Sequence, residues 1–177
     1  MTKSKFTLCI GLFVSSAFAT ADEAANLTRS MQASMDKYCA AVVKRDFKAA
    51  DKIILANFAS DCKFVSAGKV MDLKTWMTLN NQQLVAMSSI TKLSMKLSKV
   101  KVTGSRASSV ENFLMVANVK DNKKISVLRV TASNVTAMQK RNGKWLCTMV
   151  TSTPGKMMID GKPINFSGSA KTKSTAP

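Results

Sequence analysis

The chain has 177 residues, contains no histidine and carries a formal net charge of +17, from 27 Lys and Arg against 10 Asp and Glu. Without histidine it lacks the usual general base near neutral pH, Ser-His and Cys-His nucleophile pairs, and most zinc sites. The length suits one domain with a substantial core, and the basic balance favours anionic surfaces as partners. The lysines are scattered, so a solubilising surface is the simpler explanation of the charge.

Residues 1–19 have the features of a secretory signal peptide. Lys3 and Lys5 precede an apolar stretch from Phe6 to Phe18, and Ala17-Phe18-Ala19 places small residues where a signal peptidase cleaves. The stretch is shorter than the roughly 20 residues that a membrane-spanning helix needs. We therefore expect cleavage after Ala19 and an exported, periplasmic or secreted protein without a transmembrane segment.

Two helical patterns follow the leader. Apolar residues recur at helical spacing over residues 22–44, at Leu27, Met31, Met35, Tyr38 and Val42. Asp46 has the chemistry of an N-cap for a second, shorter helix, whose apolar face would be formed by Phe47, Ala50, Ile54 and Phe58. The Ala59-Ser60-Asp61 step ends this pattern.

A short hairpin and a third helix are predicted next. Residues 62–65 and 69–71 alternate in polarity around Ala67-Gly68, which favours a tight turn. Asp72 would then cap a helix whose apolar side comprises Leu73, Trp76, Met77, Leu84 and Met87. Asn80 and Gln83 fall beside that side, where they either bond to backbone at the edge of the core or line a pocket.

From Ser89 onward the period is two, which predicts a four-strand meander. The phase slips by one residue near Ser98-Lys99, as at a β-bulge, and bulges bend strands. Residues 110–119 are nearly all apolar, which predicts a central strand covered on both faces. Turns are predicted at Gly104-Ser105, Asp121-Asn122 and Asn142-Gly143. Helices followed by a bowed meander predict a helix-backed curved sheet with a hollow.

The C-terminal end is predicted in two parts. Residues 154–166 contain Asp160-Gly161 between apolar flanks, so they predict an extra hairpin over an open sheet edge or a cavity mouth. Residues 167–177 are small and basic and are expected to be disordered. The predicted organisation is thus a signal peptide, one domain over 20–166 and a tail.

Three segments resemble the nuclear transport factor 2-like superfamily, which includes SnoaL-like cyclases and ketosteroid isomerase. Residues 38–46 are similar to its first helix and the acidic start of its second, residues 64–69 to its first hairpin, and residues 143–147 to its last strand. The resemblance covers about residues 25–153. It implies an α+β fold in which a cone-shaped, curved antiparallel sheet wraps around three N-terminal helices, with a pocket between them.

The resemblance also implies where a pocket and a reaction would be. Isomerases of this superfamily use a carboxylate base and a tyrosine hydroxyl, and the candidates here are Tyr38, Asp61 and Glu111. Each has a structural alternative, since Asp61 could face solvent and Tyr38 could be a core residue. The expected lining of the pocket is Met35, Tyr38, Trp76, Asn80, Leu84, Met95, Met115 and Trp145. Methionine, with 12 residues, suits an adaptable pocket as well as an irregular core.

The cysteines and glycines give no cofactor signature. Cys39, Cys62 and Cys147 lack metal-site spacing, and no glycine-rich phosphate loop is present. The simplest role of the cysteines is as buried small apolar residues. If one disulfide forms, Cys62 with Cys147 is the favoured pair, because both lie on predicted strands. We expect no metal and no cofactor.

The leading functional hypothesis is an exported, non-catalytic domain. It would bind a small apolar or amphipathic molecule in the cone, or form a homodimer through the open sheet face as relatives of the family do. The alternatives are a proton-transfer lyase or isomerase that uses Tyr38 and Asp61, and a basic adaptor on anionic envelope surfaces. A chain with one tyrosine and two tryptophans offers few stacking platforms, so specific nucleic-acid binding is not expected.

Overall fold

The computed structural model describes residues 11–121 and 124–164. The first part of the predicted signal peptide and the predicted disordered tail at 167–177 lie outside these residues. Among the described residues, no helix combines the length and the apolar character needed to cross a membrane.

Three helices precede the meander, as predicted. They are α1 (Gly11–Val43), α2 (Phe47–Asn57) and α3 (Leu73–Ala86). The α1 helix starts at Gly11 and runs without a break past the predicted cleavage site, whereas the sequence pattern placed its start near residue 22. Asp46 caps α2 by accepting a hydrogen bond from the Ala49 amide at 3.0 Å. Asp72 caps α3 through the Thr75 amide at 2.7 Å.

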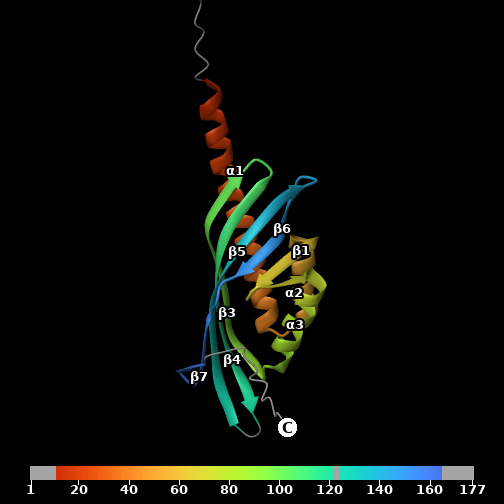
Figure 1. Ribbon diagram of the computed structural model, residues 1–177, viewed down its shortest axis with the longest axis vertical. Coiled ribbons are helices and arrows are strands. Elements are labelled where there is room, and N and C mark those ends of the chain that lie inside the picture. The colour runs from red at the N-terminus through yellow and green to blue at the C-terminus, as the bar shows by residue number, and fades with distance from the viewer. Residues whose placement is uncertain (1–10, 122–123, 165–177) are drawn as a thin grey trace, which may run out of the picture.

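The strands form one open, curved sheet (Figure 1). They are β1 (Phe58–Ser66), β2 (Lys69–Asp72), β3 (Ser89–Thr103), β4 (Arg106–Asp121), β5 (Lys124–Arg141), β6 (Lys144–Ser152), β7 (Lys156–Ile159) and β8 (Lys162–Pro163). The main order is β2-β1-β6-β5-β4-β3. The expectation of a purely antiparallel sheet is wrong at one pair, because β1 runs parallel to β6.

The predicted phase slip is a bulge in β3. The pairing of β3 with β4 shifts between Ser98 and Lys101, and Lys99 has a positive φ of 53°. An extra residue at this point bends the strand and increases its local twist. The α1 helix packs along the bent strand, where Gln32 donates to the Met95 carbonyl at 2.9 Å and accepts from the Leu97 amide at 3.0 Å.

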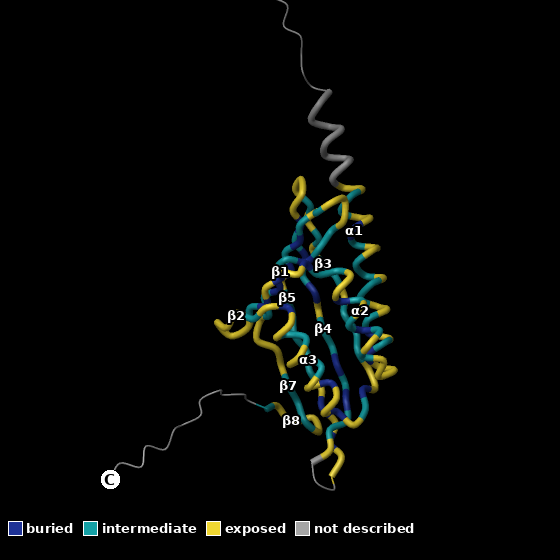
Figure 2. The backbone as a smooth tube through the Cα atoms, turned by 90° about the vertical axis from the view of Figure 1, so that its right-hand side faces the viewer, coloured by how far each residue is buried: buried dark blue, intermediate teal, exposed yellow. Residues whose placement is uncertain are grey.

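The helices cover one face of the sheet and leave the other open (Figures 1 and 2). Buried residues of α1, α3, β3, β4 and β5 form the largest core cluster, which includes Val42, Leu84 and Ala117. The opposite face of β4 is not fully covered, since Asn112 is exposed and Leu114 is half-buried. The prediction that this strand is covered on both faces is therefore wrong. Residues 110–119 are apolar at most positions because the outer face of the sheet, as well as the inner one, is rich in apolar residues.

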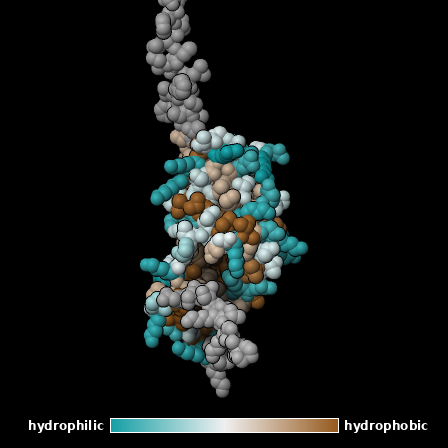
Figure 3. Space-filling model, viewed as in Figure 1, coloured by the Kyte–Doolittle hydropathy of each residue, from teal (hydrophilic) through white to brown (hydrophobic). Residues whose placement is uncertain are grey.

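The outer face carries a transverse row of apolar residues. Val110 pairs with Val135, Val135 with Thr151, Thr151 with Val65, and Val65 with Val70, so the row crosses β4, β5, β6, β1 and β2. Apolar side chains gather in the middle of this face, over β5 and β6, with hydrophilic ones around them (Figure 3).

The C-terminal segment extends the sheet at its lower end. The β6 strand pairs with residues 134–141 of β5, the chain passes close to β5 at Gly155, and β7 then pairs with residues 128–131 of the same strand. The β8 strand then folds back on β7 through a turn at Asp160-Gly161, both with positive φ. Met157 of β7 is part of the wall of a cavity, so this hairpin contributes to the hollow.

Candidate functional site

Two cavities lie between the helices and the sheet. The first, called here the Glu111 cavity, has a volume of about 90 Å³. The second, called here the Met115 cavity, has a volume of about 420 Å³. Tyr38 of α1 contributes to the lining of both. The expected hollow beneath the meander is therefore two chambers with one tyrosine between them.

The Glu111 cavity is lined by residues of all three helices and of five strands, β1, β3, β4, β5 and β6. Its walls are mainly apolar, and its lining residues are Met31, Ser34, Met35, Tyr38, Ile53, Ile54, Asn57, Phe58, Trp76, Met95, Glu111, Thr136 and Cys147. No lysine, arginine or aspartate is among them. The charge of this cavity is therefore decided by one carboxyl group, that of Glu111.

Glu111 is buried, with 5% of its surface exposed. It lies on β4, and its Oε1 atom accepts a hydrogen bond from Thr136 Oγ1 of β5 at 2.7 Å. Burial raises the pKa of Glu111 above its usual range, and hydrogen bonding by Thr136 and Asn134 opposes that rise only in part. Burial therefore favours the protonated form of this carboxyl more than exposure to water would.

A second buried hydroxyl lies beside this pair. Ser109 is directly opposite Thr136 in the β4–β5 register and is 1% exposed. Within the described part of the chain, Ser109 Oγ is the one buried side-chain oxygen or nitrogen without a hydrogen-bond partner. Buried polar groups without partners are uncommon in proteins. The concave face of the sheet therefore carries an incompletely satisfied polar patch of Ser109, Glu111 and Thr136.

Tyr38 is held at the junction of the two cavities by α3. Its hydroxyl accepts a hydrogen bond from Asn80 Nδ2 at 3.3 Å. Burial raises the pKa of Tyr38, with the Asn80 hydrogen bond acting in the opposite direction, so the hydroxyl remains protonated at neutral pH. The remaining donor capacity of this hydroxyl is available to a bound molecule.

Aromatic rings form one wall of the Glu111 cavity. Trp76 stacks on Phe64 with centroids 4.3 Å apart, and Phe58 stacks on Phe64 at 5.7 Å. Phe58 and Trp76 line the cavity itself. Stacked rings in a packed core are rigid, so this wall is a fixed surface.

The Met115 cavity is larger, and its walls are mainly apolar. Its lining residues are Tyr38, Asn80, Gln83, Leu84, Ala86, Met87, Leu93, Phe113, Met115, Val119, Leu128, Val130 and Met157. The polar groups are confined to Tyr38 and to the two amides of α3. Its volume is within the range of about 300–1,000 Å³ that is typical of small-molecule pockets.

The structure places most of the expected lining residues on these walls. Met35, Trp76 and Met95 line the Glu111 cavity, and Asn80, Leu84 and Met115 line the Met115 cavity. Trp145 lies elsewhere, which corrects that expectation. It packs against a separate cluster that contains Leu27 and Met138, with the Lys140 ammonium 5.8 Å from its ring centroid.

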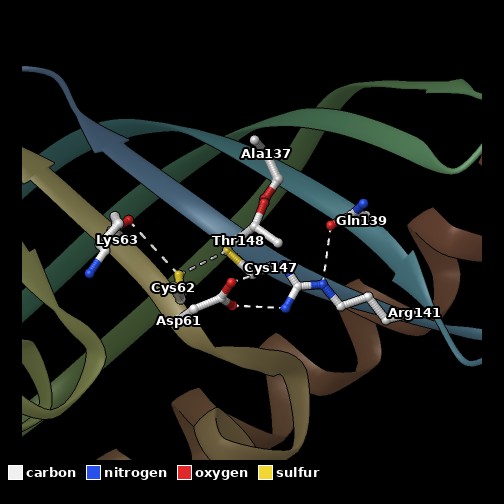
Figure 4. A network of polar contacts seen from close by, with 8 residues as sticks. All are labelled: Asp61, Cys62, Lys63, Ala137, Gln139, Arg141, Cys147 and Thr148. Carbon is white, nitrogen blue, oxygen red and sulfur yellow. Dashed lines mark hydrogen bonds and ion pairs between the residues drawn. The ribbon is translucent and has the colours of Figure 1, made fainter.

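Asp61 does not reach the cavities, so the predicted pair of Tyr38 and Asp61 is wrong. The Asp61 carboxylate forms a bidentate ion pair with Arg141, at 2.8 and 3.1 Å (Figure 4). This side chain is 61% exposed, and the Arg141 hydrogen bonds lower its pKa. The physical reason is strand alternation, because Cys62 and Phe64 point inward while Asp61 and Lys63 point outward.

The two strand cysteines lie next to each other. Cys62 Sγ and Cys147 Sγ are 3.9 Å apart, and both residues are buried (Figure 4). The thiols are free in this structure. A hydrogen bond with Cys62 and burial raise the pKa of Cys147, which keeps that thiol protonated. Among the described residues, no three Cys, Asp or Glu side chains are grouped to hold a metal ion.

Several lining residues were not anticipated from the sequence. Thr136 is an example, since hydroxyls in strands are common on either face. Met157 could have been found, because the predicted C-terminal hairpin was already considered as a cover for a cavity mouth. Phe58 was assigned to a helix face, yet it begins β1 and turns its ring toward Trp76.

Comparisons with known proteins give a match in structure alone. No family model matches the chain, and no curated protein matches it. A conserved protein of Planctomyces limnophilus is similar, with a TM-score of 0.59 and 12% identity, over 80% of this chain and 99% of that one. A nuclear transport factor 2-like superfamily protein of Salmonella enterica has a TM-score of 0.54 and 14% identity, over 73% and 91%.

An enzyme shares the same architecture. A hexachlorocyclohexane dehydrochlorinase of type 2 has a TM-score of 0.55 and 14% identity, over 82% of this chain and 94% of the enzyme. At such identities the likeness concerns the arrangement of the backbone and leaves the reaction open. The helices, the bowed mixed sheet and these likenesses show that the chain has the fold of the nuclear transport factor 2-like superfamily.

Proposed function

We propose that this protein is an exported, non-catalytic domain that binds a small apolar or amphipathic molecule between its helices and its sheet. The observation that carries the proposal is the Met115 cavity, which has a pocket-like volume and mainly apolar walls. Flexible thioethers on those walls, from Met87, Met115 and Met157, allow the lining to adapt to different apolar shapes.

The absence of a complete catalytic set supports binding over turnover. Tyr38 and Glu111 line one cavity, but the exposed Asp61 cannot join them. Proton transfer needs a base within hydrogen-bond reach of the substrate and, for an enolate, donors placed for the oxyanion. The Met115 cavity, which is large enough for a ligand, has no carboxyl group in its lining.

A pair of tryptophan substitutions tests the binding site. Ala86 lines the Met115 cavity at the end of α3, and Ala56 is an exposed alanine of α2 that lines neither cavity. The A86W side chain should occupy the cavity and reduce the affinity for the neutral apolar dye Nile red by at least about tenfold, equivalent to 1.4 kcal/mol. A56W should bind the dye like the unmodified protein in a fluorescence titration. Equal binding by both variants, or no binding by the unmodified protein, would contradict the proposal.

A second candidate role is attachment to an anionic envelope surface. One group of exposed basic residues, at the ends of two hairpins, supports this role. The β3–β4 and β5–β6 hairpins end side by side, because Arg106 pairs with Gln139. Lys101, Arg106 and Lys144 are exposed there and form no ion pair within the described part of the chain. Residues that are scattered in the sequence thus gather at one end of the molecule.

Salt dependence tests the second role. The triple variant K101E/R106E/K144E should lose retention on heparin or on phosphatidylglycerol vesicles, and the retention of the unmodified protein should fall steeply with salt. The matched control K37E/K48E/K52E changes the same charge on exposed positions of α1 and α2. Equal loss in both triple variants would assign the binding to net charge and contradict a specific basic end.

A further inference from the structure

We propose that the Glu111 cavity is a subsite for a protonated organic amine, which enters as the head of an otherwise apolar ligand. This inference rests on the proposed ligand-binding function and names the chemistry that the polar end of the ligand would have. It rests on three features of the described residues: an unpaired buried carboxyl, a wall of aromatic rings and sulfur atoms, and a narrow volume.

The first feature is the isolation of the carboxyl. The chain has 27 Lys and Arg, yet none lines the Glu111 cavity, and Glu111 takes part in none of the ion pairs of the described residues. Buried carboxylates in proteins are normally paired with a cation or hydrogen-bonded at both oxygens. Here Thr136 donates to one oxygen, Oε1, and the Asn134 amide also favours the ionised form, but neither neighbour supplies a positive charge. An ammonium group would supply both the missing charge and further donors.

The second feature is the wall opposite the carboxyl. Tyr38, Phe58 and Trp76 present aromatic surfaces to the cavity, and Met31, Met35 and Met95 present thioethers. Faces of aromatic rings attract cations within about 6 Å of the ring centroid, and Trp is the strongest in this respect. A carboxyl together with aromatic faces is the combination that binds organic cations, whereas an anionic head would be repelled by Glu111.

The third feature is size. The cavity volume of about 90 Å³ is smaller than the 150 Å³ cavity that accepts benzene in an engineered protein. A slim alkylammonium head fits such a space better than a ring does. Tyr38 borders both cavities, so the apolar body of the ligand would extend past its side chain toward the Met115 cavity.

Three probes of equal length separate the alternatives: hexylamine, 1-hexanol and hexanoate, each titrated by calorimetry at pH 7.5. We expect hexylamine to bind about tenfold or more tightly than 1-hexanol, equivalent to 1.4 kcal/mol, and hexanoate to bind weakest. In E111Q the preference for the amine should disappear while the affinity for 1-hexanol is kept. E23Q, which removes the chain's other glutamate at the surface, should leave the preference intact.

The outcomes distinguish this inference from the proposed function. Equal affinity of the unmodified protein for hexylamine and 1-hexanol would overturn the amine subsite and leave the apolar pocket standing. If neither these probes nor Nile red bind, the proposed function itself fails.

A measurement on the unmodified chain covers the case in which E111Q does not fold. Hexylamine stays protonated over pH 5–8, and Tyr38 and Cys147 are the other titratable groups facing Glu111 in the cavity. Both remain neutral over that range, since their pKa values are raised. The affinity for hexylamine should rise with pH as Glu111 ionises, and a flat profile would overturn the inference.

Discussion

Glu111 is the residue whose environment departs furthest from that of an ordinary side chain of its type. Its carboxyl is removed from water, is hydrogen-bonded by Thr136 with a further contribution from Asn134, and forms no ion pair among the described residues. Burial therefore raises its pKa in the folded state relative to the unfolded chain. By linkage, the folded protein binds more protons than the unfolded protein over the pH range between the two values.

This linkage predicts a pH-dependent loss of stability. As pH rises above about 4.3, the ordinary pKa of glutamate, the unfolded state ionises first and the free energy of unfolding falls until the folded carboxyl also ionises. E111Q should lack this fall, so the two proteins should differ more at pH 7 than at pH 4. Urea denaturation across that range measures it. A difference that is constant with pH would show that Glu111 titrates alike in both states.

Cys62 and Cys147 provide a second prediction at this scale. Their sulfur atoms, 3.9 Å apart, need only a small approach to reach the disulfide bond length of about 2.05 Å. Oxidised glutathione should form a disulfide between Cys62 and Cys147 by thiol–disulfide exchange and be reduced to two glutathione molecules. Cys39 should stay reduced. Alkylation under denaturing conditions, followed by mass spectrometry, should then label Cys39 and leave Cys62 and Cys147 unlabelled. Labelling of Cys62 and Cys147 after prolonged oxidation would contradict the pairing.

At the scale of elements, the C-terminal hairpin depends on one glycine. A Cβ atom placed on Gly155 would lie 2.4 Å from the Thr131 carbonyl oxygen and 3.1 Å from Ala132 Cβ. The chain can therefore lie this close to β5 only without a side chain at this position. This close approach allows β7 to pair with β5, and hence places Met157 in the wall of the Met115 cavity.

G155V should detach the hairpin. We expect faster hydrogen exchange of the backbone amides of residues 128–131 and weaker binding of Nile red, with the remaining strands unaffected. K156A, which shortens the exposed next side chain, should behave like the unmodified protein. Unchanged exchange in G155V would show that the chain at residue 155 can move away from β5 without losing the pairing of β7.

The contact between α1 and β3 depends on Gln32. Its amide bonds to the backbone at both Met95 and Leu97, and so satisfies polar groups of an edge strand next to the bulge. Q32A should reduce the free energy of unfolding by about 1–3 kcal/mol, because partly buried backbone groups would lose their partners. Q82A on an exposed position of α3 is the matched control. Chemical denaturation of the two variants measures the difference, and equal stabilities would contradict the role of Gln32.

At the scale of the whole molecule, the basic surface is organised by topology. Adjacent hairpins place Lys101, Arg106 and Lys144 at one end, where Glu23 also anchors the start of the packed part of α1 through Lys140. The cavities lie further along the same helix, behind Met31 and Tyr38. A surface role at the end and a binding role in the interior would therefore use separate residues and can be tested independently.

The sequence by itself determined the order and the limits of most elements, because these depend on local interactions. Asp46 and Asp72 cap the next helices through hydrogen bonds that span three residues, and Asn142-Gly143 adopts the positive φ values of a tight turn. The bulge near Lys99 was visible as a phase change in a period-two pattern. None of these features needs a distant part of the chain.

Only the tertiary structure decided which acidic residue lies inside. Residues 110–119 are apolar at both odd and even positions, so alternation could not show that Glu111 faces the helices. The inward positions of Cys62 and Phe64 indicate by alternation that Asp61 faces solvent. Its partner Arg141, however, lies far away in sequence and meets Asp61 only through the β1–β6 pairing. Which face of a strand is buried depends on register with distant strands, and that information is not local.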